Sequence, residues 1–299
     1  MKPRLKILAL IFPNSQMATQ ARVLRQSLGI AQWLDGELHL MVPGFDLEWV
    51  GNALDKAAAE KSLKVPVELH SVKDDYLIES IDAIQEVHAD LLTFEYSYAA
   101  TEEMSPAMDK LKLSVLELSS IPVLLQPSHP SAQISAMNSF IVPVSGERPK
   151  QDALKLALHL ATITDRNVKI VHVEAQNSAA TRQSSPLTCV ADQAYHEYSH
   201  LLDQVVSEAC PMSSITERQR VTEVLHLSGN APEQISRLME HDPKNILVLQ
   251  WKGIIPHRRV EMIKTLLRSD SHFPILIVKV QPAAQSRLNT GKFFTKKAG

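Results

Sequence analysis

Hydrophobic positions along the first 125 residues follow two alternating patterns. Short apolar runs bounded by Pro, Asn, Asp or Gly predict buried β-strands, whereas apolar residues spaced by threes and fours predict helices. The apolar runs predict strands at 5–12, 37–42, 67–72, 90–94 and 123–125. Helices are predicted between them at 23–34, 47–63, 74–88 and 107–118.

This strict alternation of strands and helices predicts a parallel sheet. Parallel neighbours need crossover connections, and helices of this length supply them. Helices of this kind cover both faces of such a sheet. We therefore predict a doubly wound α/β domain.

The second half of the chain repeats the same order. Strands are predicted at 140–144, 168–173, 221–227, 245–249 and 275–280, with helices at 151–163, 191–209, 232–240 and 259–267. Single segments also match, since Ile121-Pro122-Val123-Leu124-Leu125 parallels Phe273-Pro274-Ile275-Leu276-Ile277. The pattern predicts two tandem copies of one domain, each a five-stranded parallel sheet with helices on both faces.

Domain boundaries follow from composition. Residues 126–137 contain Pro127, Pro130 and three serines, which is typical of a linker. We predict a first domain at 1–127, a linker at 128–137, a second domain at 138–282 and a flexible basic tail at 283–299. Residues 174–190, rich in Ser, Thr, Ala, Gln and Asn, are expected to form a surface loop.

Composition and charge exclude several classes of protein. Hydrophobic residues make up 44% of the 299 residues and charged residues 21%, which excludes a largely disordered chain. The net charge of -2 gives no overall field to attract nucleic acid or an anionic membrane. No apolar run reaches membrane-spanning length, and two cysteines, Cys189 and Cys210, cannot build a disulfide framework or a Cys-rich zinc site. A cytoplasmic location is expected, with no nucleic acid or membrane as partner.

Three segments of the second half carry a family resemblance. Phe140-Ile141-Val142-Pro143-Val144-Ser145-Gly146, Leu227-Ser228-Gly229-Asn230-Ala231-Pro232 and Phe273-Pro274-Ile275-Leu276-Ile277-Val278 occur in the order of an opening strand, a third strand with its turn and a last strand. In this order the chain resembles the universal stress protein family in its tandem two-domain form. The resemblance covers nearly the whole chain and implies strand order 3-2-1-4-5 in each domain, with any ligand between strands one and four.

The resemblance also implies a nucleotide site, which can be checked by position. Many members bind ATP through an Asp after strand one, a Gly-x-x-Gly segment after strand four and a later Gly-Ser or Gly-Thr pair. In the second half Ser145 replaces the Asp, Gly146 is kept, Gln250 replaces the first glycine and Gly253 matches the second. The later pair falls on Glu261-Met262. The vestigial candidate site comprises Val144, Ser145, Gly146, Val173 and Gly253.

The first half departs further from the family's nucleotide motif. Its turn after strand one reads Phe12-Pro13-Asn14, its glycine positions read Glu95 and Tyr98, and its later pair reads Asp109-Lys110. Glu95 and Asp109 would add negative charge where phosphate has to sit. We expect this half to be structural, as an intramolecular pseudo-dimer partner of the second.

The remaining candidate ligand residues are histidines and one basic run, and each has two interpretations. His196 and His200 lie four apart on a predicted helix, which suits a metal ion but also a solvated helix face. His172 could line a ligand site, or be a core histidine with a backbone partner. The run His257-Arg258-Arg259 could hold an anion or begin an exposed helix.

The predicted function is a non-catalytic tandem stress protein that acts by ligand sensing or partner binding. No phosphate loop, dinucleotide fingerprint or nucleophile elbow occurs, so no catalytic residue and no metal ligand is assigned. Nucleotide binding is expected to be weak or absent, and no cofactor is expected. The alternative is an adenine-nucleotide sensor that binds ATP or AMP in the second domain only, with slow ATP hydrolysis as an enzymatic variant. A homodimer and an unidentified protein partner are compatible with both.

Overall fold

The structure is a computed structural model, and it describes most of both halves of the chain. The described residues are 4–13, 17–44, 47–61, 65–73, 75–96, 106–127, 134–144, 152–174, 206, 216, 219–242, 244–251 and 273–279. Several sequence predictions therefore lie outside the described residues. These are the roles of Ser145, Gly146, Gly253, Glu261-Met262, Tyr98, His196, His200, the 257–259 run, both cysteines and the basic tail.

The described part of the first half contains five strands and four helices, as predicted. Its elements are β1 (Lys6–Leu10), α1 (Met17–Trp33), β2 (Glu37–Pro43), α2 (Leu47–Lys61), β3 (Val67–Val72), α3 (Tyr76–Glu86), β4 (Leu91–Glu95), α4 (Pro106–Leu118) and β5 (Val123–Gln126). The helix predicted from residue 23 begins earlier, at Met17, because its first turns carry polar residues that the apolar spacing does not reveal.

The described part of the second half repeats this order. Its elements are η1 (Ile134–Ala136), β6 (Ser139–Val144), α5 (Asp152–Thr164), β7 (Asn167–Glu174), β8 (Val221–Ser228), α8 (Ala231–His241), β9 (Asn245–Trp251) and β10 (Ile275–Lys279). The helices predicted at 191–209 and 259–267 lie almost wholly outside the described residues.

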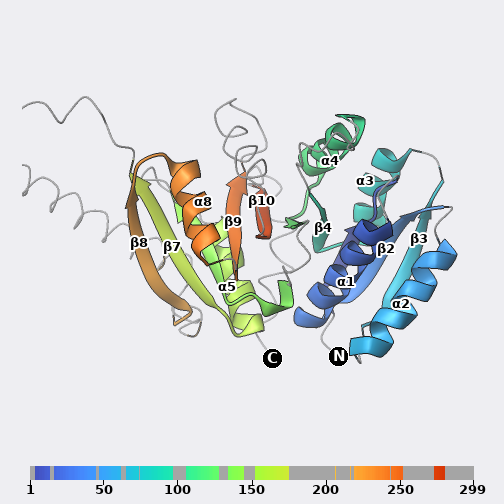
Figure 1. Cartoon of the computed structure of the whole chain (residues 1–299), viewed down its shortest axis with the longest axis horizontal. Helices are drawn as coiled ribbons and strands as arrows, with labels where there is room; N and C mark the ends of the chain where they lie inside the picture. The colour runs from blue at the N-terminus through green and yellow to red at the C-terminus, as the bar shows by residue number, and fades with distance from the viewer. Residues whose placement is uncertain are drawn as a thin grey trace, which may run out of the picture.

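The ten described strands form one continuous sheet in the order β3-β2-β1-β4-β5-β10-β9-β6-β7-β8. Each half has the order 3-2-1-4-5, which confirms the predicted topology, and all pairs within a half are parallel. The sequence led us to expect that the halves pair but not which strands would meet: β5 and β10 pair antiparallel in the middle of the sheet. Figure 1 shows the first half on the right and the second on the left of this junction.

Two hydrophobic layers cover the two faces of the sheet. One contains buried residues of α1, α2 and α5, and the other buried residues of α3, α4 and α8. Successive strand residues alternate between the layers, so that Ile7 and Ala9 face one and Leu8 and Leu10 the other. Burial on both faces explains why inner strands such as β1 and β9 read as nearly continuous apolar runs.

Helices α1 and α5, which correspond in the two halves, end in the same way. Asp35 after α1 and Asp165 after α5 both have a left-handed backbone, with φ of 50° and 55°. In each half the next residue closes the helix, since Gly36 N donates to Ala31 O and Arg166 N to Ala161 O, both at 2.8 Å. Because the two helix ends match, each residue of α1 corresponds to the residue of α5 that lies 130 positions later in the chain.

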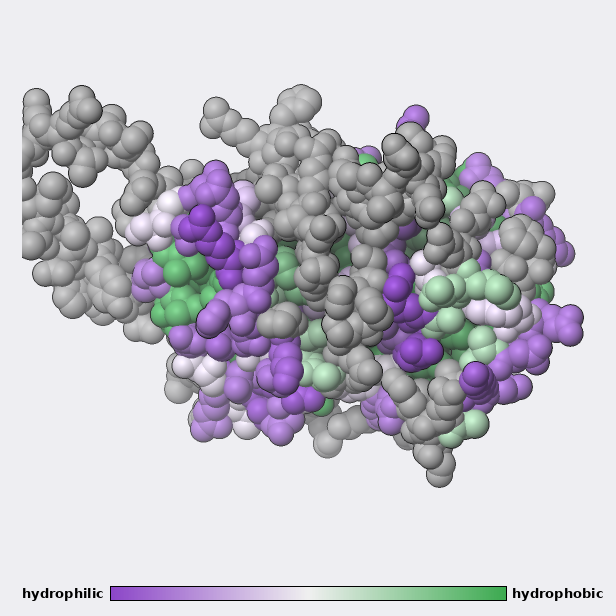
Figure 2. Space-filling view, in the orientation of Figure 1, coloured by the Kyte–Doolittle hydropathy of each residue, from purple (hydrophilic) through white to green (hydrophobic). Residues whose placement is uncertain are grey.

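The outer edge of the second half is the more exposed part of the sheet. Along β8 most positions are exposed or half-buried, and Val224 is 42% exposed. Figure 2 shows hydrophobic residues at the surface on the left of the view, over β7 and β8, with hydrophilic residues around them.

Among the described residues, no helix is long and apolar enough to cross a membrane.

Candidate functional site

Each half has a switch point where the strand order reverses, at the carboxyl ends of β1 and β4 and of β6 and β9. Ligands of open α/β sheets bind at such points. Strand pairing relates the two: Ile7 lies opposite Leu91, and Phe140 opposite Ile246. Glu95 of the first half is therefore equivalent to Gln250 of the second, which agrees with the sequence comparison.

Glu95 ends β4 as a buried carboxylate, and an arginine of α1 neutralises it. Arg22 Nη2 donates to Glu95 Oε1 at 3.0 Å, where the Glu95 side chain is only 6% exposed and that of Arg22 24%. The same Nη2 also donates to Thr19 Oγ1 at 3.2 Å. The pair spans from the second turn of α1 to the carboxyl end of β4.

The electrostatics of Glu95 reflect a balance of burial and charge. Burial raises the pKa of the Glu95 carboxyl above its ordinary value, while Arg22 and Lys112 act in the opposite direction. Lys112 is itself buried, with Nζ 5.6 Å from the centre of the Phe12 ring. Glu95 would repel a phosphate, and Arg22 and Lys112 act as its counter-charges inside the protein. The site therefore already contains an anion, Glu95, and two cations, Arg22 and Lys112.

Aromatic side chains fill the turn after β1. The Phe12 ring centroid lies 5.3 Å from that of Tyr76 and 5.4 Å from that of Phe94, and all three residues are buried. The Tyr76 hydroxyl donates to Ile11 O at 2.7 Å, and burial raises the pKa of this hydroxyl well above its usual value. A nucleotide base or ribose would have to displace these packed rings.

A buried polar network lies beneath the same switch point. The Gln126 amide donates to Ser27 Oγ and to Thr93 Oγ1, both at 2.9 Å, and Thr93 Oγ1 donates to Leu124 O at 2.8 Å. The network connects α1, β4 and β5 in the interior. By strand and helix register the equivalent residues of the second half are Ala157, Val248 and Val278, so this network is replaced there by hydrophobic packing.

Among the described residues, the second switch point has a different pair of side chains from the first. Register places Asp152 and Gln250 where the first half has Arg22 and Glu95, so no ion pair forms between these two positions. Gln250 is half-buried, and its Nε2 has no hydrogen-bond partner among the described residues. In the part of the site that the structure describes, this neutral amide replaces the carboxylate that Glu95 places at the first switch point.

Two of the five predicted site residues can be placed. Val144 ends β6 and is buried, Val173 is half-buried near the end of β7, and the two strands are neighbours. They share one carboxyl edge of the sheet, as a site would require. His172 of β7 lies opposite Val144 and is half-buried, with Nδ1 3.4 Å from Val144 O. It has the backbone partner that one interpretation expected, but it does not lie fully in the core.

Sequence reasoning missed Arg22 and Lys112. Both lie on helices in positions that pattern alone would assign to solvent. The signal that could have found them is Glu95 itself, because a carboxylate directly after the apolar run 91–94 has to be buried and needs a cation nearby.

Comparisons with known proteins support the fold. No family model matches the chain, and no curated protein matches it. Among solved structures, a universal stress protein from Archaeoglobus fulgidus DSM 4304 has 16% identity and a TM-score of 0.58, over 92% of this chain and 96% of that one. A protein of unknown function from Pseudomonas aeruginosa PAO1 has 14% identity and a TM-score of 0.63, over 98% of this chain and 96% of that one. Since the match to the universal stress protein covers both halves of this chain, the chain has the universal stress protein fold in its tandem form, with two copies in one polypeptide.

Proposed function

We propose that the chain is a non-catalytic tandem stress protein that acts by sensing a ligand or binding a partner, with weak or no nucleotide binding. The observation that carries this proposal is the filled first switch point. There the Arg22–Glu95 ion pair and the packed ring of Phe12 stand where the nucleotide motif of the resembled family has its first glycine and its turn after strand one. The first half would then serve as scaffold and partner for the second.

The second half is the one in which a nucleotide could still bind. Gln250 presents there an amide with no partner among the described residues, instead of a carboxylate, which favours the alternative proposal of an adenine-nucleotide sensor confined to this half. The replacement of the family's Gly-Ser pair by Glu261-Met262 argues against tight binding, because a carboxylate repels phosphate and methionine has no hydroxyl to donate. Slow hydrolysis of ATP remains the enzymatic form of this alternative.

The two halves act in this proposal as an intramolecular pseudo-dimer. The antiparallel pairing of β5 with β10 supports it, since related copies joined in this way are connected by an approximate two-fold rotation. The hydrophobic side chains of both strands are buried at this junction. An additional homodimer or a separate protein partner would have to use other surfaces.

Calorimetric titration of the full chain with MgATP tests the proposal. We expect no binding, or one site with a Kd of about 1 mM or weaker, near -4 kcal/mol. Incubation with MgATP should release no phosphate above the buffer rate. Tight binding at two sites would overturn the proposal, and tight binding at one site would favour the sensor.

A pair of matched variants locates any nucleotide site. Glu261→Gly with Met262→Ser should raise ATP affinity, by about tenfold if it gains about 1.4 kcal/mol. The corresponding change in the first half, Asp109→Gly with Lys110→Ser, should leave ATP affinity unchanged, because Phe12 and the Arg22–Glu95 pair still fill that switch point. Equal effects of both double variants would contradict the assigned difference between the halves.

A further inference from the structure

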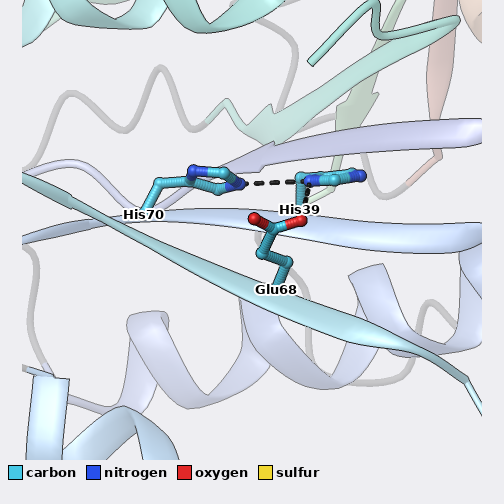
Figure 3. Close-up of side chains that lie close together, drawn as sticks. All are labelled: His39, Glu68 and His70. Carbon is cyan, nitrogen blue, oxygen red and sulfur yellow. Dashed lines mark hydrogen bonds and ion pairs between the residues drawn. The ribbon is translucent and has the colours of Figure 1, made fainter. Parts of the chain in front are cut away.

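A cluster of two histidines and a glutamate lies on the edge of the first half, away from either switch point. The tripeptide Glu-Leu-His occurs twice, as residues 37–39 in β2 and 68–70 in β3. Parallel pairing sets His39 opposite Glu68, and the alternation of side chains along a strand puts His39, Glu68 and His70 on one face. Figure 3 shows the three side chains pointing toward one another.

The spacing of the donor atoms matches that around a metal ion. His39 Nδ1 lies 3.1 Å from His70 Nε2 and 3.3 Å from Glu68 Oε2. Donor atoms of a tetrahedral zinc ion, with bonds of about 2.0–2.1 Å, lie roughly 3.3–3.4 Å apart. All three donor atoms lie within 4.8 Å of one another. The Glu68 side chain is 66% exposed, so it is free to rotate and shorten the remaining distance.

A second carboxylate orients His39. Glu37 Oε1 lies 3.3 Å from His39 Nε2, on the side of the ring away from the cluster. A ring that donates from Nε2 to Glu37 directs the lone pair of Nδ1 toward His70 and Glu68. A histidine ligand held in this way by a carboxylate is the usual support of a metal site. Lys6 Nζ, 3.4 Å from Glu37 Oε1, in turn holds this carboxylate.

Burial and charge suit a cationic ligand at this place. His39 is buried and His70 half-buried, so both rings are partly shielded from water. Each neutral imidazole can offer one ring nitrogen lone pair to a metal ion. The exposed Glu68 supplies the negative charge, and it leaves solvent access for a further ligand such as water.

The equivalent positions of the second half show what this edge needs for folding alone. Register places Lys169 at the position of His39, Glu223 at that of Glu68 and Leu225 at that of His70. Lys169 and Glu223 form an ion pair at 3.1 Å. An ordinary cross-strand ion pair therefore suffices to hold these strands together, and the two histidines of the first half add donors that the fold does not require.

We propose that His39, Glu68 and His70 form a binding site for a divalent transition metal of the zinc class, with one coordination position open to solvent. Two imidazole donors and one carboxylate are the donor set of many zinc sites with an open position. On binding, the proton on His70 Nε2 moves to Nδ1 of the same ring, so that Nε2 can coordinate. The site is independent of nucleotide binding at either switch point.

The test uses the full chain after dialysis against a chelator. Calorimetric titration with zinc should give one site per chain, and titration with Co²⁺ should give visible absorption bands of a four- or five-coordinate ion. His39→Lys with His70→Leu copies the second half and should keep the fold while abolishing both signals. His70→Leu alone, at a half-buried position, repeats the test in case the double variant does not fold.

Two control variants separate this site from other histidines. His241→Gln removes an exposed histidine of α8, and His196→Gln with His200→Gln removes the histidines spaced by four residues. Both controls should bind zinc as the original chain does. Glu37→Gln should weaken zinc binding by about 10–100-fold without removing a ligand. Undiminished binding by His70→Leu, or loss of the signals in the His196/His200 variant, would overturn the proposal.

Discussion

Leu125 of β5 lies opposite Ile275 of β10 in the antiparallel pairing that joins the two halves of the sheet. The neighbouring pairs, Leu124 with Leu276 and Val123 with Ile277, are also aliphatic, and all six residues are buried. Separation of the halves would expose two hydrophobic strand edges at once. The junction is therefore a part of the core and not a loose contact between domains.

Cleavage of the predicted linker should leave the halves together. With a protease site inserted within 128–133, the cut chain should elute as one species near the intact mass of 33.3 kDa, because the β5–β10 pairing persists. Size-exclusion chromatography and circular dichroism check this expectation. Leu276→Asp in the same cleavable protein should weaken the association of the fragments. Separation of fragments without that substitution would show that the junction is weak.

Loss of Arg22 should destabilise the chain. In Arg22→Ala the Glu95 carboxylate stays buried without its partner, and we expect a loss of about 2–4 kcal/mol at pH 7. Arg22→Met with Glu95→Leu should recover most of this loss, because hydrophobic residues can replace a buried ion pair. Urea unfolding measures both, with Asp152→Ala as the equivalent single change in the second half.

The decrease in the free energy of unfolding caused by Arg22→Ala should also depend on pH. Burial raises the folded-state pKa of Glu95 above its value in the unfolded chain, and loss of the arginine removes an opposing contribution. The folded state then binds a proton more readily than the unfolded state, so stability falls as pH rises through the folded-state pKa. The difference between Arg22→Ala and the original chain should be smaller at pH 5 than at pH 7. An equal difference at both pH values would contradict this assignment.

Lys279 at the end of β10 should make stability depend on alkaline pH. Burial lowers the pKa of its ammonium group to about 8, although Glu117 acts in the opposite direction. The ammonium donates to Glu117 O and lies 5.5 Å from the centre of the Trp251 ring. Between pH 8 and 10 the unfolded chain binds more protons at this lysine, so the free energy of unfolding should rise with pH. Lys279→Met should flatten that rise, and parallel curves for both proteins would be the contrary result.

The Gln126 network should behave as a unit. Gln126→Val alone leaves the Ser27 and Thr93 hydroxyls without their amide donor, and we expect a loss of about 1–3 kcal/mol. The triple change Ser27→Ala, Thr93→Val and Gln126→Val installs the residues of the second half, and it should cost less than the sum of the three single changes. Thermal and urea unfolding of all four variants decide between coupling and simple additivity.

Most of the fold could be predicted from the sequence because its signals are local. Strand Val67–Val72 was predicted at its observed bounds, and strand order followed from alternation and the resemblance. The β5–β10 junction could not be predicted, since it depends on the docking of two edges whose apolar residues would suit many partners. The Arg22–Glu95 pair joins residues 73 positions apart, and the His39–His70 contact needs β2 and β3 to be neighbours in a known register.

Because the two copies lie in one chain, a substitution in one copy is not repeated in the other. In an assembly of two identical chains, every substitution appears on both sides of the symmetry axis. Here each copy meets a partner encoded by different codons, so Glu95 of one copy corresponds to Gln250 of the other. Covalent linkage also keeps the copies together at any protein concentration. One copy can thus carry a buried ion pair or a histidine cluster while the other half of the molecule keeps its own residues.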